Sequence, residues 1–81
     1  MTKYVELRFY GELTDFLHYE RTTGTVRRSF DVAGSVMDMI EACGVPHTEV
    51  AMILAHGRTV GFGYRVRDGD RIAVYPPFRS L

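Results

Sequence analysis

The feature that most constrains the fold is the most clearly marked helix in the chain, which begins after Gly34. Ser35 can accept a hydrogen bond from a backbone N–H of the first turn. Apolar residues then recur at the spacing i, i+3, i+4 and i+7, namely at Val36, Met39, Ile40 and Cys43. Gly44 and Pro46 end the helix. A helix of two to three turns with one apolar stripe needs a second layer to pack against.

Alternating or apolar runs on both sides of this helix predict that second layer. Val5, Leu7 and Phe9 alternate with polar residues, which is typical of a half-buried strand. The sequence predicts strands over residues 4–10, 25–32, 50–55, 58–60 and 71–75. A short helical turn is expected around Leu13 and Leu17, and the pair His56-Gly57 is expected to form a turn.

Two strands, a crossing helix and further strands on one sheet describe a β-grasp. We therefore predict an α+β fold, a ubiquitin-like β-grasp with a mixed sheet of four to five strands packed on one main helix. The first and last strands should pair at the centre. Eighty-one residues leave no room for a second core, so residues 1–81 are expected to form one domain, with 76–81 as a tail or linker.

Charge and cysteine content narrow the function classes. Ten Lys plus Arg balance ten Asp plus Glu, and a neutral domain is a poor candidate for binding nucleic-acid phosphates. The arginines are expected on solvated strand faces, balanced by acids such as Asp68 and Asp70. The N-terminus has no apolar run like that of a signal peptide, and no stretch has the length of a membrane span. The expected compartment is the cytoplasm.

No residue pattern predicts catalysis, a cofactor or a metal site. Cys43 lies on the apolar stripe of the helix, where a thiol usually packs as a small hydrophobe. His18, His47 and His56 lie in separate loops without paired ligand spacing. The chain is therefore expected to be no enzyme.

Aromatic residues near the C-terminal end are the candidate interaction site. Aromatic side chains and arginine are the types that anchor protein interfaces. The predicted protein-interaction residues are Phe62, Tyr64, Tyr75, Phe78 and Arg79. An alternative is that Phe62 and Tyr64 simply cover the open end of a small core.

One segment near the C-terminal end resembles the ending of the ubiquitin-like sulfur carriers ThiS and MoaD. It is the run Val66-Arg67-Asp68-Gly69-Asp70-Arg71-Ile72-Ala73-Val74-Tyr75-Pro76-Pro77. In those families a D-G-D turn leads into the last strand, a short proline-containing stretch and a Gly-Gly pair that becomes a thiocarboxylate. Here Ser80 and Leu81 stand at the end of the sequence, which speaks against carrier chemistry.

A second resemblance fits this departure. The middle of the chain is similar to the ubiquitin-like domain that precedes Mut-seven-C, PIN-like ribonuclease domains. The matching residues are Gly44-Val45-Pro46-His47-Thr48-Glu49-Val50, followed by Ile53-Leu54, Gly57-Arg58 and Val60. That family continues through a Tyr-Pro-x-Phe-x-Ser stretch, which Tyr75-Pro76-Pro77-Phe78-Arg79-Ser80 matches. The resemblance implies a free-standing accessory domain or a piece of a longer protein.

The sequence thus predicts a non-catalytic, ubiquitin-like protein-interaction module related to sulfur carriers. Its expected partner is another protein domain, by resemblance a PIN-like nuclease in cis or in trans. Two alternatives stay open: a sulfur carrier in molybdopterin or thiamin biosynthesis, and an RNA-binding accessory domain that uses arginine and aromatic side chains.

Overall fold

Five strands, one α-helix and two short 3-10 helices make up the computed structural model, which describes residues 2–17 and 23–78. In chain order the elements are β1 (Lys3–Phe9), η1 (Gly11–Phe16), β2 (Thr25–Phe30), α1 (Val36–Ala42), η2 (His47–Glu49), β3 (Met52–Ala55), β4 (Arg58–Val60) and β5 (Arg71–Tyr75).

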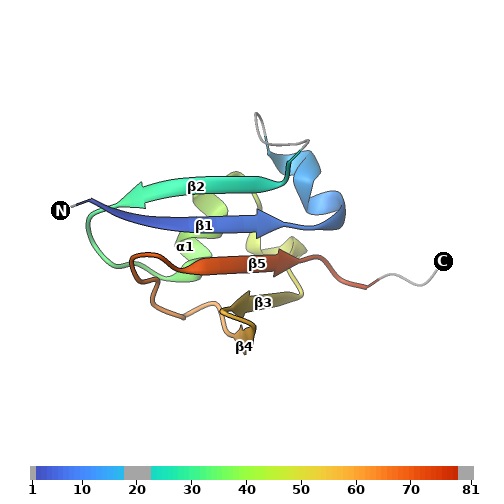
Figure 1. Ribbon diagram of the computed structural model, residues 1–81. Helices are drawn as coiled ribbons and strands as arrows, with labels where there is room; N and C mark the ends of the chain where they lie inside the picture. Colours follow the sequence, from blue (N-terminus) through green and yellow to red (C-terminus); the bar gives the residue numbers. More distant parts are fainter. Residues whose placement is uncertain (1, 18–22, 79–81) are drawn as a thin grey trace.

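The strands form one mixed sheet in the order β2-β1-β5-β3-β4. β1 and β5, the first and last strands, lie side by side and parallel at its centre, as Figure 1 shows. The pairs β1–β2, β3–β5 and β3–β4 are antiparallel. This topology confirms the predicted β-grasp, including the central pairing of the terminal strands.

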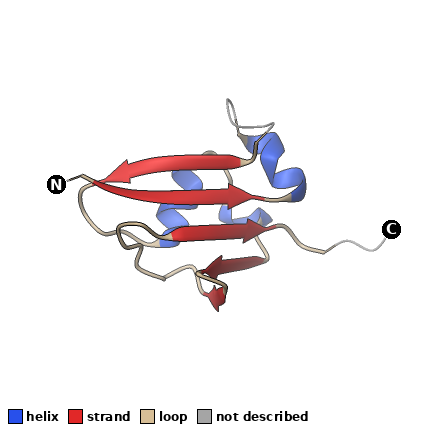
Figure 2. Cartoon of the chain, viewed as in Figure 1, coloured by secondary structure: helices blue, strands red, loops and turns tan. Residues whose placement is uncertain are grey.

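The hydrophobic core lies between the sheet and α1, which lies behind the sheet in the view of Figure 2. Inward-facing residues of the strands alternate with exposed ones, as in the pattern of β1. The fully buried side chains include Leu7, Leu13, Ile40, Val66 and Val74. In the described part of the chain, the other face of the sheet carries no helix, and this open face positions the candidate site.

The first turn of α1 has hydrogen-bond acceptors for three of its backbone N–H groups. The Ser35 hydroxyl accepts from the Asp38 N–H at 3.2 Å, which confirms the predicted cap. The carbonyls of Tyr64 and Phe62 accept from the N–H groups of Val36 and Met37 at 2.8 and 3.2 Å. Because helix N–H groups otherwise lack partners there, the 62–64 segment is fixed against the helix.

Replacing Ser35 with alanine is expected to lower the free energy of unfolding by about 1 kcal/mol, because the Asp38 N–H loses its acceptor. Urea unfolding followed by circular dichroism measures the change. Ser29→Ala, at an exposed position of β2, is the matched control and should change stability by less than about 0.5 kcal/mol. Equal effects of the two substitutions would contradict the capping role.

Two predicted strands are shorter in the structure. β2 ends at Phe30, because the chain bends at Asp31 to reach α1 and leaves Val32 82% exposed. β3 begins at Met52, after the 3-10 turn η2, which the sequence pattern did not predict. The other predicted turns are present: His56 and Gly57 have φ values of 52° and 79°, which turn β3 into β4.

Candidate functional site

A stacked pair of tyrosines lies on the open face of the sheet. Tyr10 and Tyr75 both point outward, because their neighbours Phe9 and Val74 point into the core. The parallel register pairs Phe9 with Val74, and the Tyr10 N–H donates to the Val74 carbonyl at 3.0 Å. The two rings therefore meet with centroids 4.5 Å apart and planes 4° apart.

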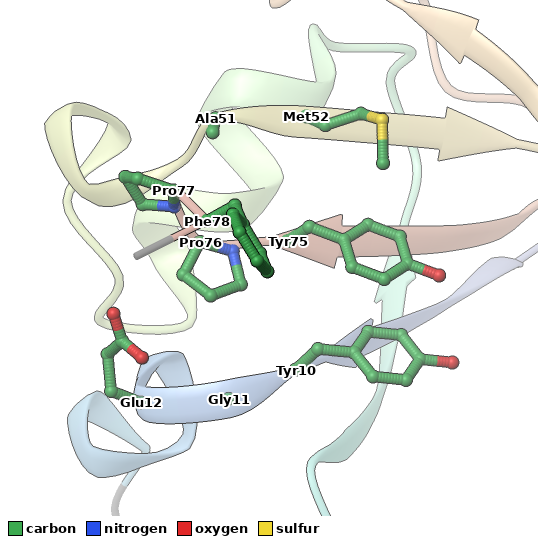
Figure 3. A pocket seen from close by; sticks show the side chains of 9 residues that line it. All are labelled: Tyr10, Gly11, Glu12, Ala51, Met52, Tyr75, Pro76, Pro77 and Phe78. Atoms are coloured by element: carbon green, nitrogen blue, oxygen red, sulfur yellow. The ribbon is translucent and has the colours of Figure 1, made fainter. Parts of the chain in front are cut away.

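The stacked pair borders a groove of about 710 Å³, which we call the tyrosine groove. Figure 3 shows the two rings side by side with Met52 beside them and the 76–78 segment at the other end. The groove is lined by Tyr10, Gly11, Glu12, Ala51, Met52, Tyr75, Pro76, Pro77 and Phe78. A concave and mostly apolar lining is typical of a surface that receives another molecule.

Strand pairing and a close contact between Gly11 and the Pro76 ring fix the walls of the groove. β3 lies antiparallel to β5 with Met52 opposite Tyr75, so these side chains share the open face. Pro76 continues from β5 and lies against Gly11, whose φ is +58°. A Cβ atom at Gly11 would lie 3.0 Å from the Cγ atom of Pro76, so the close approach of the two segments favours glycine.

Large apolar side chains of the groove are exposed. Met52 is 40% exposed and Phe78 is 95% exposed. Partial burial, together with the neighbouring Tyr10, raises the pKa of Tyr75 above its ordinary 10.0, so its hydroxyl stays neutral at physiological pH. The groove therefore offers apolar contact area and the neutral hydroxyl group of Tyr75.

The structure brings two of the five predicted site residues together. Tyr75 and Phe78 line the tyrosine groove. Phe62 lies in a neighbouring hollow that shares Met52 with the groove, and its ring meets the His47 ring edge-on at 5.7 Å. Tyr64 is half-buried against the core and does not line the groove. Arg79 lies outside the described residues.

Sequence reasoning missed Tyr10 and Met52 as members of the site. The alternation of β1 placed Tyr10 outward, but nothing local in the sequence places it beside a residue 65 positions later. Met52 precedes the buried Ile53 within the run 50–55, where every residue is apolar and no alternation marks the outward positions. The register between β1, β5 and β3 is the missing information.

Asp70 is a buried carboxylate, which corrects the expectation that it balances arginines on a solvated face. It is 4% exposed. Its oxygens accept from the Arg67 N–H and the Tyr64 hydroxyl, both at 2.8 Å, and contact His56 Nε2 at 2.7 Å. Its carbonyl accepts from the Glu6 N–H at 3.0 Å. Asp70 thus fixes the start of β5 beside β1, and with it the register of the tyrosine groove.

The Asp70 contacts predict a pH dependence of stability. Burial raises the pKa of Asp70, but hydrogen bonds from the Arg67 N–H, His56 and Tyr64 together lower it by more, to a net value below 3.8. A carboxylate with a depressed pKa stabilises the fold above its unfolded pKa, and this contribution is lost as the pH falls through the folded pKa.

We expect the free energy of unfolding to fall between about pH 5 and about pH 3, and to fall less in Asp70→Asn. Urea unfolding at both pH values measures this, and both lie below the ordinary titration range of histidine. An equal fall in the wild type and the variant would contradict the role of Asp70.

Histidine, cysteine and acidic side chains outside the groove are the other candidates for a chemical site. No group of three or more His, Cys, Asp and Glu side chains there could hold a metal ion. His47 instead contacts the Glu41 carboxylate at 2.6 Å, and His18 lies outside the described residues. Cys43 is half-buried against the core. No helix in the described ranges has the length and apolar character needed to cross a bilayer.

The fold and its open sheet face define a ubiquitin-like β-grasp domain. The model of the Mut7-C ubiquitin family matches residues 2–81, so the chain belongs to that family. This confirms the resemblance drawn from the 44–60 and 75–80 segments. No curated protein sequence matches the chain.

Solved structures share the fold at low sequence identity. Small archaeal modifier protein 1 of Haloferax volcanii has a TM-score of 0.71 and 20% identity, covering 94% of this chain and 99% of that one. The Haloferax volcanii HVO 2177 protein has a TM-score of 0.70 and 20% identity, covering 99% and 88%. A protein of Pyrococcus furiosus assigned as molybdopterin converting factor, subunit 1, has a TM-score of 0.70 and 16% identity, covering 94% and 99%.

Proposed function

We propose that this domain is a non-catalytic protein-interaction module that binds a partner protein through the tyrosine groove. The observation that carries the proposal is a concave apolar surface on the uncovered face of the sheet, where the end of β1, the start of β3 and the end of β5 meet. Tyrosine, methionine and phenylalanine are enriched in the cores of protein interfaces. Phe78, at 95% exposed, is a large side chain that a partner would cover.

The segment after β5 supports an interaction role over carrier chemistry. The sulfur carriers place a Gly-Gly pair after a short stretch that follows the last strand. Here residues 76–81 contain no glycine, and Pro76 and Pro77 are half-buried and line the groove. The partner we propose is a PIN-like nuclease domain, in cis or in trans, because the chain belongs to the Mut7-C ubiquitin family and its sequence resembles the domain that precedes Mut-seven-C, PIN-like ribonucleases. The cytoplasmic location stays a prediction.

A site-specific photo-crosslinker tests the proposal. The photoreactive residue replaces Met52 in the groove, which is 40% exposed, or, as the control, Val32, which is 82% exposed but lies before α1. Crosslinking in host cells and mass spectrometry should give one protein adduct at position 52 that Tyr75→Ala removes, and none at position 32. Adducts of equal yield at the two positions would refute the groove as the contact site.

A second candidate function is a protein modifier or sulfur carrier, favoured by the fold shared with small archaeal modifier protein 1 and the molybdopterin converting factor subunit. Such a function needs an activated C-terminal glycine. Mass spectrometry of the protein after incubation with an activating enzyme, ATP and a sulfur source tests it. A C-terminal thiocarboxylate would establish carrier chemistry and displace the interaction proposal.

A further inference from the structure

The tyrosine groove continues into a basic stretch of the same sheet face. Tyr10 lines the groove and also a second hollow, formed with Glu6, Arg8 and Arg71. Glu6 and Arg71 in turn line a third hollow that reaches Tyr4 and Arg27. The three hollows follow the outward residues of β1 from Tyr10 to Tyr4. This distance is about 20 Å, because a strand rises about 3.3 Å per residue.

Three arginines dominate the charge of this stretch. Arg8, Arg27 and Arg71 surround Glu6, because Arg27 and Arg71 lie opposite it on β2 and β5. Among the described residues none of the three arginines forms an ion pair. Three guanidinium groups against the carboxylates of Glu6 and of Asp70, which also lines the third hollow, leave a net positive charge, although the whole chain is neutral.

Two of the guanidinium groups lie against tyrosine rings. The Arg27 Cζ atom is 4.5 Å from the centre of the Tyr4 ring, and the Arg8 Cζ atom is 5.9 Å from the centre of the Tyr10 ring. Such contacts hold a planar guanidinium in place while its N–H groups remain available for a carboxylate. Arg8 and Arg27 are therefore already held against rings with N–H groups available for an anionic partner.

We propose that the groove and this basic stretch together bind an extended acidic peptide segment of the partner, a refinement that rests on the proposed function. An apolar side chain occupies the tyrosine groove beside Tyr75. Asp or Glu side chains two and four positions away reach Arg8 and Arg71, because alternate residues of an extended segment are about 7 Å apart and face the same side.

A peptide fits this face better than single-stranded nucleic acid. Bases bind such sheets by stacking on open aromatic faces. Here the Tyr10 ring is stacked on Tyr75 and flanked by Arg8, and the Tyr4 ring carries Arg27.

Selection from a phage-displayed library of random twelve-residue peptides, with the folded domain as bait, tests the proposal. Enriched peptides should carry an apolar residue with Asp or Glu two to four positions away. Arg8→Gln and Arg71→Gln should each weaken binding of such a peptide about threefold, while Arg65→Gln, in the loop beside α1, should leave it unchanged. The Arg71→Glu variant should bind a version of the peptide in which lysine replaces the acidic residues more tightly than the original peptide.

The outcomes separate this inference from the proposed function. Enriched peptides without acidic residues, or arginine variants that bind the peptide as well as the wild type does, would contradict the inference that the partner segment is acidic. If Tyr75→Ala abolishes binding in that case, the proposed binding function of the groove is still supported. Absence of any peptide that depends on Tyr75 would count against both. Binding of a twenty-nucleotide oligouridylate that requires Arg8 and Arg71 would overturn the proposal in favour of RNA.

Discussion

Tyr75→Ala is expected to weaken partner binding about thirtyfold or more while the domain stays folded. The side chain lies at the centre of the tyrosine groove, stacked on Tyr10 and opposite Met52. Central aromatic residues are the ones whose truncation costs 2 kcal/mol or more at protein interfaces, and 1.4 kcal/mol is tenfold in affinity. Loss of the ring stack itself should lower stability by only about 1 kcal/mol.

Binding of the crosslinked partner, measured by biolayer interferometry, gives the affinity of each variant. Tyr4→Ala is the matched control: it removes an exposed tyrosine from the same sheet face, outside the tyrosine groove. Its affinity should stay within about fivefold of the wild type, because it loses one cation–π contact. Equal losses for the two variants would mean that the groove is not the centre of the interface.

Asp70→Ala is expected to destabilise the domain by about 3 kcal/mol. The substitution leaves the partly buried Arg67 N–H and Tyr64 hydroxyl without their acceptor, and a donor left without a partner costs about 1–3 kcal/mol, the lower end applying where water can reach it. The His56 ring is largely exposed and can return to water. For a chain of this size about 3 kcal/mol is a large part of the total stability.

The control for Asp70→Ala lies in the same turn. Asp68 accepts one hydrogen bond, from the Tyr4 N–H at 2.9 Å, and is exposed. Asp68→Ala should therefore cost less than about 1 kcal/mol in urea unfolding. A double-mutant cycle of Asp70→Ala with Tyr64→Phe should show coupling of about 1 kcal/mol, because the hydroxyl has no role once its acceptor is gone. Additive effects would show that the buried contact is not the cause.

The sequence predicted the fold well because its elements are marked locally. The alternation of Val5, Leu7 and Phe9, the apolar stripe of α1 and the turn at Gly69 are each readable within a few residues. Their order then leaves few ways to form one sheet over one helix. The strand ends at Phe30 and Met52 were less readable, because they depend on where the chain must leave the sheet to reach α1 and η2.

The candidate site was predicted in part, since its residues come from distant strands. Tyr75 and Phe78 follow from the alternation of β5 and the residues after it. Tyr10 and Met52 join them through the β1–β5–β3 register, which is a property of the whole sheet. Tyr64 was expected at the surface, but its hydroxyl turns to the buried Asp70, which also raises the pKa of Tyr64.

A chemical-shift map of the ¹⁵N-labelled domain on addition of its unlabelled partner tests the tyrosine groove most directly. We predict that the largest shifts fall on Tyr10, Met52 and Tyr75, with smaller ones along β1 and none on the exposed side of α1. Largest shifts on α1 or along the outer edge of β2, with the groove unaffected, would contradict the proposed function.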